Sequence, residues 1–257
     1  MTNYDSNTTI LMPTSIIPSH PDTRIIEETL TSIRHHFPTA LIVILCDGLR
    51  SELEHRRQAY DQYLENLAIV ANNYCPGVTL LLHGEHRHQT HMVKHALDNF
   101  VVTPLIVFQE HDLPVRTDVG TDWQMMADAI LSDRVNLVRL MLHEQIHEAH
   151  YHLMDGMIDG LPLMKQRQFS GWTHMASADM YRRLLDGFDM RAKIMVERYV
   201  CRFIENVPWD RWRLTSYIPD PNAARRIYHL DGRGAGVERY EDRQLTYEET
   251  ECYPPKL

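Results

Sequence analysis

Short apolar runs that alternate with longer amphipathic stretches constrain the fold of this chain more than any other feature of its sequence. The clearest run, LIVIL at residues 41–45, is rich in β-branched side chains and has the length of a buried strand. A helical pattern of apolar residues follows it over 53–71. Further apolar runs stand at residues 9–12, 78–82 and 105–108. This alternation predicts an α/β fold with a mostly parallel central sheet flanked by helices, in which ligands bind beyond the carboxyl ends of the strands.

The second half of the chain has a less regular pattern. Residues 135–142 are typical either of a strand or of the start of a helix. Elsewhere the pattern predicts helices over 176–185 and 193–206, a weak strand over 164–169 and a short strand over 226–229. No convincing domain boundary is visible, so we expect a single domain over residues 1–257 with an irregular C-terminal region.

The composition excludes several classes of protein. Hydrophobic residues make up 44% and charged residues 24% of the chain, which is ordinary for a globular protein and unlike a disordered one. Four cysteines without paired spacing do not make a disulfide scaffold, and the apolar runs are too short to span a membrane. The polar N-terminus lacks the basic region of a secretory signal, so we expect a cytoplasmic protein. The net charge of −9 does not suit unspecific binding to nucleic acid, although it leaves room for a local basic groove.

Acidic side chains follow two of the predicted strands. Glu110 and Asp112 come directly after the run at 105–108, and side chains two apart on an extended chain point the same way. Two adjacent carboxylates are costly unless a cation lies between them, and Mg²⁺ or Mn²⁺ takes such oxygens and completes its shell with phosphate and water. Asp47 ends what we expect to be a neighbouring strand and can accept hydrogen bonds from a nucleoside. The alternative interpretation is that these carboxylates are solvated strand ends.

The order of these motifs resembles that of a known enzyme family. The chain resembles family-2-like glycosyltransferases with the GT-A fold, which is a Rossmann-like fold. The motifs that carry the resemblance are, in order, Pro13-Thr14, Asp47-Gly48, His83-Gly84 before a helix, and Glu110-His111-Asp112. The resemblance covers about residues 9–115. It implies that 1–115 forms a nucleotide-sugar-binding half and 116–257 the acceptor and catalytic half. It also implies that Pro13, Thr14 and Asp47 hold the nucleoside. Glu110 and Asp112 would then hold Mn²⁺ or Mg²⁺ with the diphosphate, with Glu in the place of the family's first Asp.

The resemblance also implies roles for residues of the second half. Glu197, or else Asp179, would be the general base of an inverting reaction, and a late histidine, His229 or else His174, would complete the metal shell. The alternatives are that Glu197 is a surface glutamate paired with an arginine and that each histidine is hydrogen-bonded within its own loop.

Two further side chains are candidates for the donor site. Arg87 can offer a bidentate fork to a phosphate, and Trp172 can stack on a sugar or a base. A solvated arginine and a packed tryptophan are the alternatives.

We therefore expect a metal-dependent glycosyltransferase that moves a sugar from a nucleoside-diphosphate sugar to an acceptor hydroxyl. The acceptor would be a glycan, a small metabolite or a hydroxymethylated DNA base. Salt-sensitive binding would mark a DNA acceptor. A non-catalytic sugar-nucleotide binder is a third class, which would bind nucleotide without turnover. The arginines that could bind a DNA acceptor lie in the second half, at positions 182, 183, 191, 211, 213, 225 and 226.

Two groups of histidines suggest metal sites that compete with the glycosyltransferase interpretation. His143-Glu144-x-x-His147 matches the H-E-x-x-H motif, which on a helix binds zinc and would make the chain a zinc metallopeptidase. The residues before it have strand character, and His150 and Leu153 stand where a metzincin needs Gly and His. A second cluster lies at positions 83, 86, 88, 91 and 95. We expect these side chains to line a cleft or contact phosphates, with a metal site as the alternative.

Overall fold

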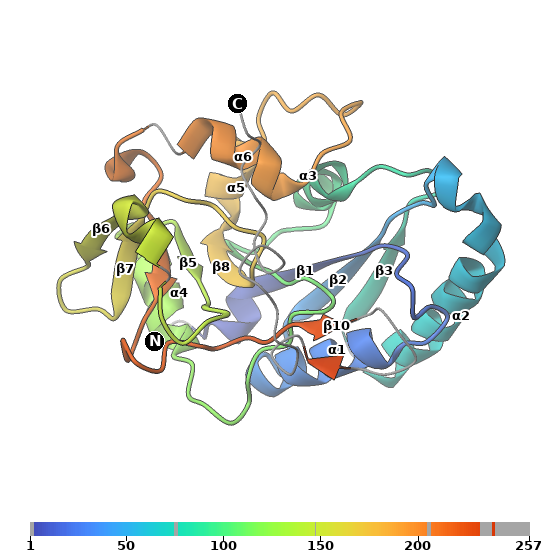
Figure 1. Ribbon diagram of the computed structural model, residues 1–257, viewed down its shortest axis with the longest axis horizontal. Coiled ribbons are helices and arrows are strands. Elements are labelled where there is room, and N and C mark those ends of the chain that lie inside the picture. Colours follow the sequence, from blue (N-terminus) through green and yellow to red (C-terminus); the bar gives the residue numbers. More distant parts are fainter. Residues whose placement is uncertain (1–2, 75–76, 147, 205–206, 232–237, 240–257) are drawn as a thin grey trace.

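A computed structural model describes residues 3–74, 77–146, 148–204, 207–231 and 238–239. A nine-stranded sheet runs through the molecule in the order β3-β2-β1-β4-β8-β5-β9-β7-β6 (Figure 1). The strands of the first half are β1 (Thr8–Thr14), β2 (Leu41–Cys46), β3 (Val78–Leu82) and β4 (Leu105–Phe108). Those of the second half are β5 (Leu137–Arg139), β6 (Met154–Met157), β7 (Leu163–Gln166), β8 (His174–Ser177) and β9 (Leu214–Tyr217). A separate two-stranded ribbon joins β10 (Leu230–Asp231) to β11 (Glu238–Arg239).

The first four strands are parallel, as the alternation of apolar runs predicts. Every residue of β1 and β4 is buried, because helices cover both faces of the sheet there. The second half is mixed. β8 runs antiparallel to both β4 and β5, β5 pairs with β9 in parallel, and β7 and β6 continue antiparallel. The predicted α/β class is therefore confirmed, with its parallel part concentrated in the first half.

Six helices flank the sheet in the described part of the chain. They are α1 (Arg24–His36), α2 (Arg57–Asn73), α3 (Gln89–Asn99), α4 (Trp123–Leu131), α5 (Ala178–Leu184) and α6 (Val196–Ile204). Residues of α1, α2 and α4 build the hydrophobic core on one face, and residues of α3, α5 and α6 build the core on the other (Figure 1). No helix in these described ranges combines the length and the apolar character needed to cross a membrane.

Several predicted boundaries need correction. The helix expected over 53–71 begins as a short 3-10 helix, Ser51–Arg56, before α2. The helix expected over 176–185 starts at residue 178, because its first residues belong to β8. Residues 226–229 form only an isolated bridge, and the strand pairing begins at Leu230. The ambiguous stretch 135–142 contains the strand β5, and 164–169 contains most of β7.

Candidate functional site

The register of the first strands places their carboxyl ends at one edge of the sheet. Cys46 of β2 lies opposite Thr14 of β1, and Phe108 of β4 lies opposite Leu11 of β1. Pro13 and Thr14, Asp47 and Glu110 therefore reach the same edge. The expectation that the two acid-bearing strands are neighbours is wrong, because β1 lies between β2 and β4.

Asp47 is buried and both of its carboxylate oxygens accept hydrogen bonds. Its Oδ1 accepts hydrogen bonds from the backbone N–H of Gly48 (2.9 Å) and of Arg87 (2.7 Å). Its Oδ2 accepts from the N–H of His88 (3.1 Å) and lies 2.8 Å from Nδ1 of His86. A carboxylate offers about four acceptor positions, and three of them accept backbone N–H groups here while the His86 ring lies beside the second oxygen. Asp47 therefore fixes the loop that precedes α3.

Gly48 allows that loop to lie against the end of β2. A Cβ atom at this position would be 2.1 Å from the carbonyl carbon of Glu85 and 2.5 Å from the nitrogen of His86. Both contacts are with backbone atoms, so no side-chain movement would relieve them. The Asp47-Gly48 pair thus combines an anchor for the loop with the space that the loop needs.

Glu110 lies half-buried at the N-terminal end of α3. Its Oε1 accepts a hydrogen bond from Nε2 of Gln89 at 3.0 Å. The backbone turns directly after it, with the N–H of Leu113 bonded to the carbonyl of Glu110 at 3.3 Å. The extended conformation expected for residues 110–112 is therefore wrong. Burial, the charge of Asp112 and the charge of Glu197 nevertheless raise the pKa of Glu110 to about 8, so the three acids face a common region.

Glu197 comes to Glu110 from α6. Its Oε2 accepts a hydrogen bond from the backbone N–H of Gly171 at 2.7 Å. A Cβ atom on Gly171 would lie 3.0 Å from Oε1 of Glu110 and 3.4 Å from Oε2 of Glu197. Gln89 joins both elements, because its Oε1 accepts from the N–H of Val196 at 3.1 Å. Glycine at 171 therefore lets the backbone lie against two carboxylates at once.

His229 completes this group from the C-terminal segment. Its Nε2 lies 3.4 Å from Oδ2 of Asp112, and the N–H of Leu230 donates to the carbonyl of Asp112 at 2.8 Å. We refer to Glu110, Asp112, Glu197 and His229 as the acid centre. It draws on three separate segments of the chain.

The acid centre fits a hard divalent cation. Oδ1 of Asp112 is buried and has no hydrogen-bond partner in the described ranges, although a buried carboxylate oxygen ordinarily has one. Carboxylate oxygens are the ligands that Mg²⁺ and Mn²⁺ take. No three ligating side chains within these ranges already enclose an ion position. Such ions commonly use one or two carboxylates and complete their shell with substrate phosphates and water.

The structure does not bring Asp179 to the acid centre. Asp179 lies on α5, is strongly exposed and pairs with Arg182 at 3.0 Å. Arg182 in turn bonds the carbonyls of Leu97 and Val101 at the C-terminal end of α3. Glu110 contacts the opposite end of that helix, which is about 16 Å long.

His174 is not placed to bind a metal. It is buried, with Nδ1 2.6 Å from the carbonyl of Trp172 and Nε2 2.5 Å from the hydroxyl of Tyr181. Burial lowers its pKa to about 4, so the ring stays neutral. Both ring nitrogens are used within the core.

The remaining candidates lie around the edge of the sheet. Thr14 is buried, and its hydroxyl lies 3.1 Å from that of Tyr63. The guanidinium of Arg87 is 3.1 Å from Glu85. Trp172, one residue from Gly171, packs beneath the guanidinium of Arg139 at 4.9 Å.

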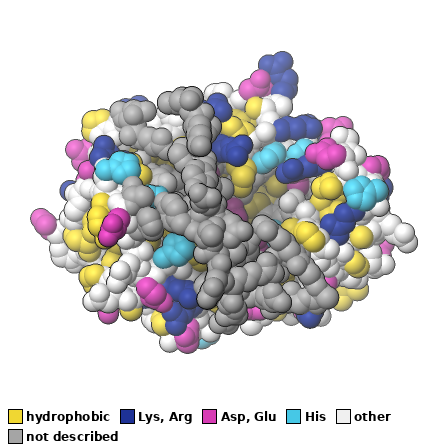
Figure 2. Space-filling model, viewed as in Figure 1, with side chains coloured by type: hydrophobic (Ala, Val, Ile, Leu, Met, Phe, Trp, Pro, Cys, Tyr) yellow, Lys and Arg dark blue, Asp and Glu magenta, His cyan; other side chains and the backbone are white. Residues whose placement is uncertain are grey.

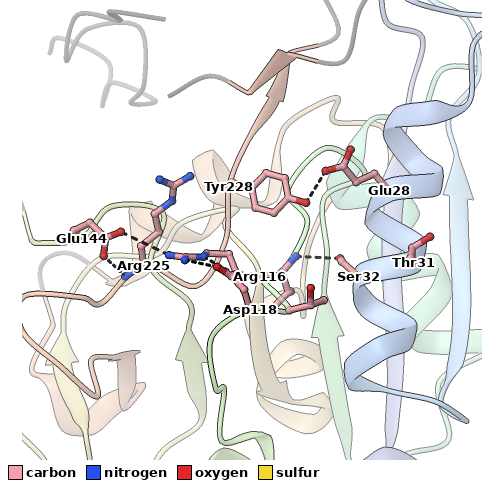
Figure 3. A pocket seen from close by; sticks show the side chains of 10 residues that line it. Glu28, Thr31, Ser32, Arg116, Asp118, Glu144, Arg225 and Tyr228 are labelled. Atoms are coloured by element: carbon pink, nitrogen blue, oxygen red, sulfur yellow. Dashed lines mark hydrogen bonds and ion pairs between the residues drawn. The ribbon is translucent and has the colours of Figure 1, made fainter. Parts of the chain in front are cut away.

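The helix on which the zinc-peptidase interpretation depends is not formed at residues 143–146. His143 packs its ring against Trp172, and His147 lies outside the described residues. Glu144 lines a groove of about 670 Å³ beside α1. There it faces Arg116 at 3.7 Å and accepts from the N–H of Arg225 (Figure 3).

Several arginines of the second half are paired or buried in the described part of the chain. Arg191 pairs with Asp189 and Arg213 with Asp133, while Arg226 is buried and donates to backbone carbonyls. Where the described residues are visible in Figure 2, acidic and basic side chains are interspersed. These contacts favour a salt-bridged surface over a DNA-binding groove.

Sequence reasoning missed Gln89 and Gly171. Gln89 is an ordinary first residue of a helix, and its two bonds reach segments 21 and 107 residues away. Gly171 has no unusual backbone angle, and its role depends entirely on carboxylates delivered by other segments. Neither leaves a local signal.

Comparison with solved structures identifies the fold. Residues 1–349 of S. aureus TarS match with a TM-score of 0.52 at 13% identity, over 87% of this chain and 60% of that one. UDP-glucose pyrophosphorylase complexed with UDP-glucose matches with a TM-score of 0.53 at 9% identity, over 86% of this chain and 92% of that one. GalNAc-T7 with UDP, GalNAc and Mn²⁺ matches with a TM-score of 0.50 at 10% identity, over 88% of this chain and 44% of that one. Neither a protein-family model nor a curated protein sequence matches. The chain thus has the GT-A-like fold of nucleotide-diphospho-sugar transferases.

Proposed function

We propose that this protein is a metal-dependent glycosyltransferase that moves a sugar from a nucleoside-diphosphate sugar to an acceptor hydroxyl. The observation that carries the proposal is the acid centre, in which Glu110 and Glu197 flank Gly171 while Asp112 lies beside His229. The GT-A-like fold supports it, and so do the UDP-glucose in one named structure and the UDP, GalNAc and Mn²⁺ in another.

Glu110, Asp112 and His229 would hold Mn²⁺ or Mg²⁺. When bound, the ion would neutralise the charge that develops on the departing diphosphate. The raised pKa of Glu110 fits this assignment, because a cation is the group that would allow these carboxylates to be ionised together. His229 would add a ligand from the second half of the chain.

Glu197 would act as the general base. The hydrogen bond from Gly171 orients the carboxylate of Glu197, which would accept the proton of an acceptor hydroxyl. The deprotonated oxygen would then attack the anomeric carbon from the face opposite the diphosphate, which inverts the configuration. Asp179 points to solvent at the far end of α3 and does not suit this role.

The donor would lie along the carboxyl edge of β1 and β2. Pro13 and Thr14 would border the nucleoside, and Asp47 would act through the loop that it anchors, because its carboxylate oxygens already accept backbone N–H groups. Arg87, on that loop, would contact a phosphate, and Trp172 would stack on the sugar or the base.

A screen of nucleotide sugars tests the binding half of the proposal. We expect one UDP- or GDP-sugar to raise the melting temperature in the presence of Mn²⁺ and not in a chelator. Asp112→Asn should abolish the metal-dependent shift and donor hydrolysis. Asp118→Asn, an exposed acid of the next loop paired with Arg116, should keep both. Equal shifts in wild type and Asp112→Asn would contradict the metal assignment.

Turnover tests the catalytic half. Glu197→Gln should keep donor binding and lower transfer about 10²-fold or more, which is the usual contribution of a general base. Asp179→Asn should leave both unchanged. Donor binding without transfer to any glycan, metabolite or hydroxymethylated DNA in a broad panel would instead indicate a non-catalytic binder.

A nucleotidyltransferase is the second candidate, because the chain covers 92% of UDP-glucose pyrophosphorylase. Such an enzyme must hold a nucleoside triphosphate, and phosphate-rich ligands are commonly held by glycine-rich loops and basic side chains. Residues 15–23 after β1 contain no glycine, lysine or arginine. Release of pyrophosphate from a triphosphate and a sugar phosphate would favour this candidate over the transferase.

A further inference from the structure

Three histidines form a compact cluster away from the acid centre. His83 directly follows β3, and its N–H donates to the carbonyl of Cys46, which fixes its backbone beside β2. His91 and His95 lie one turn apart on α3. The ring centres are 5.9 Å apart for His83 and His91, 5.4 Å for His83 and His95, and 6.5 Å for His91 and His95. We call these three side chains the histidine triad.

Each ring of the triad has one buried nitrogen without a hydrogen-bond partner among the described residues. These atoms are Nε2 of His83, Nδ1 of His91 and Nδ1 of His95. Buried polar atoms are ordinarily bonded, so each of these nitrogens has an unused capacity to bind a partner. Burial is the main cause that lowers the pKa of His83 and of His91, and it favours the neutral imidazole. Neutral imidazole is the form that binds metals.

The spacing of the rings is close to that of a metal site. A metal about 2.1 Å from one nitrogen of each of three imidazoles places the ring centres about 5 Å apart. The observed separations exceed this by an ångström or so, and the rings lie steeply inclined to one another. No three ligating side chains of the described residues already enclose an ion, so binding requires the rings to move.

We propose that the histidine triad is a binding site for a transition-metal ion such as Zn²⁺, distinct from the acid centre. Imidazole ligands favour Zn²⁺ and its neighbours over Mg²⁺ or Mn²⁺, which take carboxylates. His91 follows Gln89 by two positions and so faces a different side of α3 from the side chain that contacts Glu110. The positive charge of Arg87 disfavours a cation at the triad, and the negative charge of Asp47 favours one. A bound ion would clamp α3 to the end of β3.

The experiment uses untagged, chelator-treated full-length protein titrated with Co²⁺ and Zn²⁺ in excess Mg²⁺, which occupies the acid centre so that Co²⁺ reports on the triad. We expect one Co²⁺ per chain with visible d–d bands, displaced by Zn²⁺, and a higher melting temperature with Zn²⁺. His91→Gln and His95→Gln should each weaken Co²⁺ binding at least tenfold. His55→Gln, an exposed histidine elsewhere, and Asp112→Asn should leave it unchanged.

The outcomes separate this proposal from the proposed function. If neither ion binds stoichiometrically to the wild type, or if His91→Gln and His95→Gln bind Co²⁺ as the wild type does, the triad is not a metal site. Loss of Co²⁺ binding in Asp112→Asn with retention in both triad variants would assign the ion to the acid centre and would equally overturn the proposal. The partly exposed positions of His91 and His95 make folded variants accessible, and far-UV circular dichroism would verify them.

Discussion

The carboxyl group of Glu110 links the electrostatics of single residues to the proposed chemistry. Its pKa of about 8 lies above the ordinary value of 4.5, first because of burial and then because of Asp112. The folded chain therefore binds this proton more tightly than the unfolded chain. Between these two pKa values the folded state holds more protons, so this group lowers stability as the pH rises from about 4.5 to 8.

Replacing Glu110 with glutamine tests whether this group lowers the stability of the fold as the pH rises. In the presence of a chelator, the wild type should lose unfolding free energy between pH 5 and pH 8 by up to about 1.4 kcal/mol per pH unit from this group. Glu110→Gln should flatten that part of the profile and be the more stable protein at pH 8. Urea unfolding across the pH range measures both. Glu65→Gln, an exposed helix glutamate, serves as the control and should follow the wild type; an unchanged slope in Glu110→Gln would contradict the assignment.

At the scale of elements, the start of α3 organises the site. The loop before it is held by Asp47, and its first residue, Gln89, bonds both Glu110 and the backbone at the start of α6. One helix end thus sets the position of two carboxylates that come from different parts of the chain.

Removing the Gln89 side-chain amide should affect both of these contacts. Gln89→Leu leaves the N–H of Val196 without its partner, so we expect a loss of about 1–3 kcal/mol in unfolding free energy. Displacement of Glu197 should also lower transfer at least tenfold, because small shifts of a catalytic group are costly. Denaturant unfolding and turnover measure the two effects. Gln62→Leu on the exposed face of α2 should change neither, and wild-type behaviour of Gln89→Leu would disprove the bridging role.

The elements that sequence predicted are those whose signals are local. The strands before Asp47 and Glu110 are continuous apolar runs, and their carboxyl ends lie at one edge of the sheet, as predicted. The turn after Glu110 was not predicted, because nothing in Glu110-His111-Asp112 forbids an extended chain. The partners of Asp47 were not predicted either, since backbone N–H groups about 40 residues away leave no pattern in the sequence.

At the scale of the whole molecule, one sheet joins the two halves of the chain. β4 of the first half pairs with β8 of the second along Leu105–Phe108, and the order of strands then continues to β6. The acid centre therefore has its first two carboxylates after β4 and its third on a helix packed on the same sheet. Buried residues of β4, β8 and α6 share one hydrophobic core, which joins the elements that carry these carboxylates.

This connection predicts how the molecule responds to its donor. Binding of a nucleotide sugar with Mn²⁺ should leave the small-angle scattering profile unchanged within error, because no hinge separates the halves. Hydrogen exchange should slow in the loop that Asp47 anchors and in the segment after Glu110, with little change in β4 and β8. A clear decrease in the radius of gyration on donor binding would contradict this prediction.

The β4–β8 ladder also bears on how a protein of this design could change its specificity. Segments that leave the sheet at its carboxyl edge can be lengthened or exchanged while the strands beneath them keep their pairing. Engineering for a new acceptor would therefore begin with grafts in these connecting segments, and the strands would tolerate little alteration.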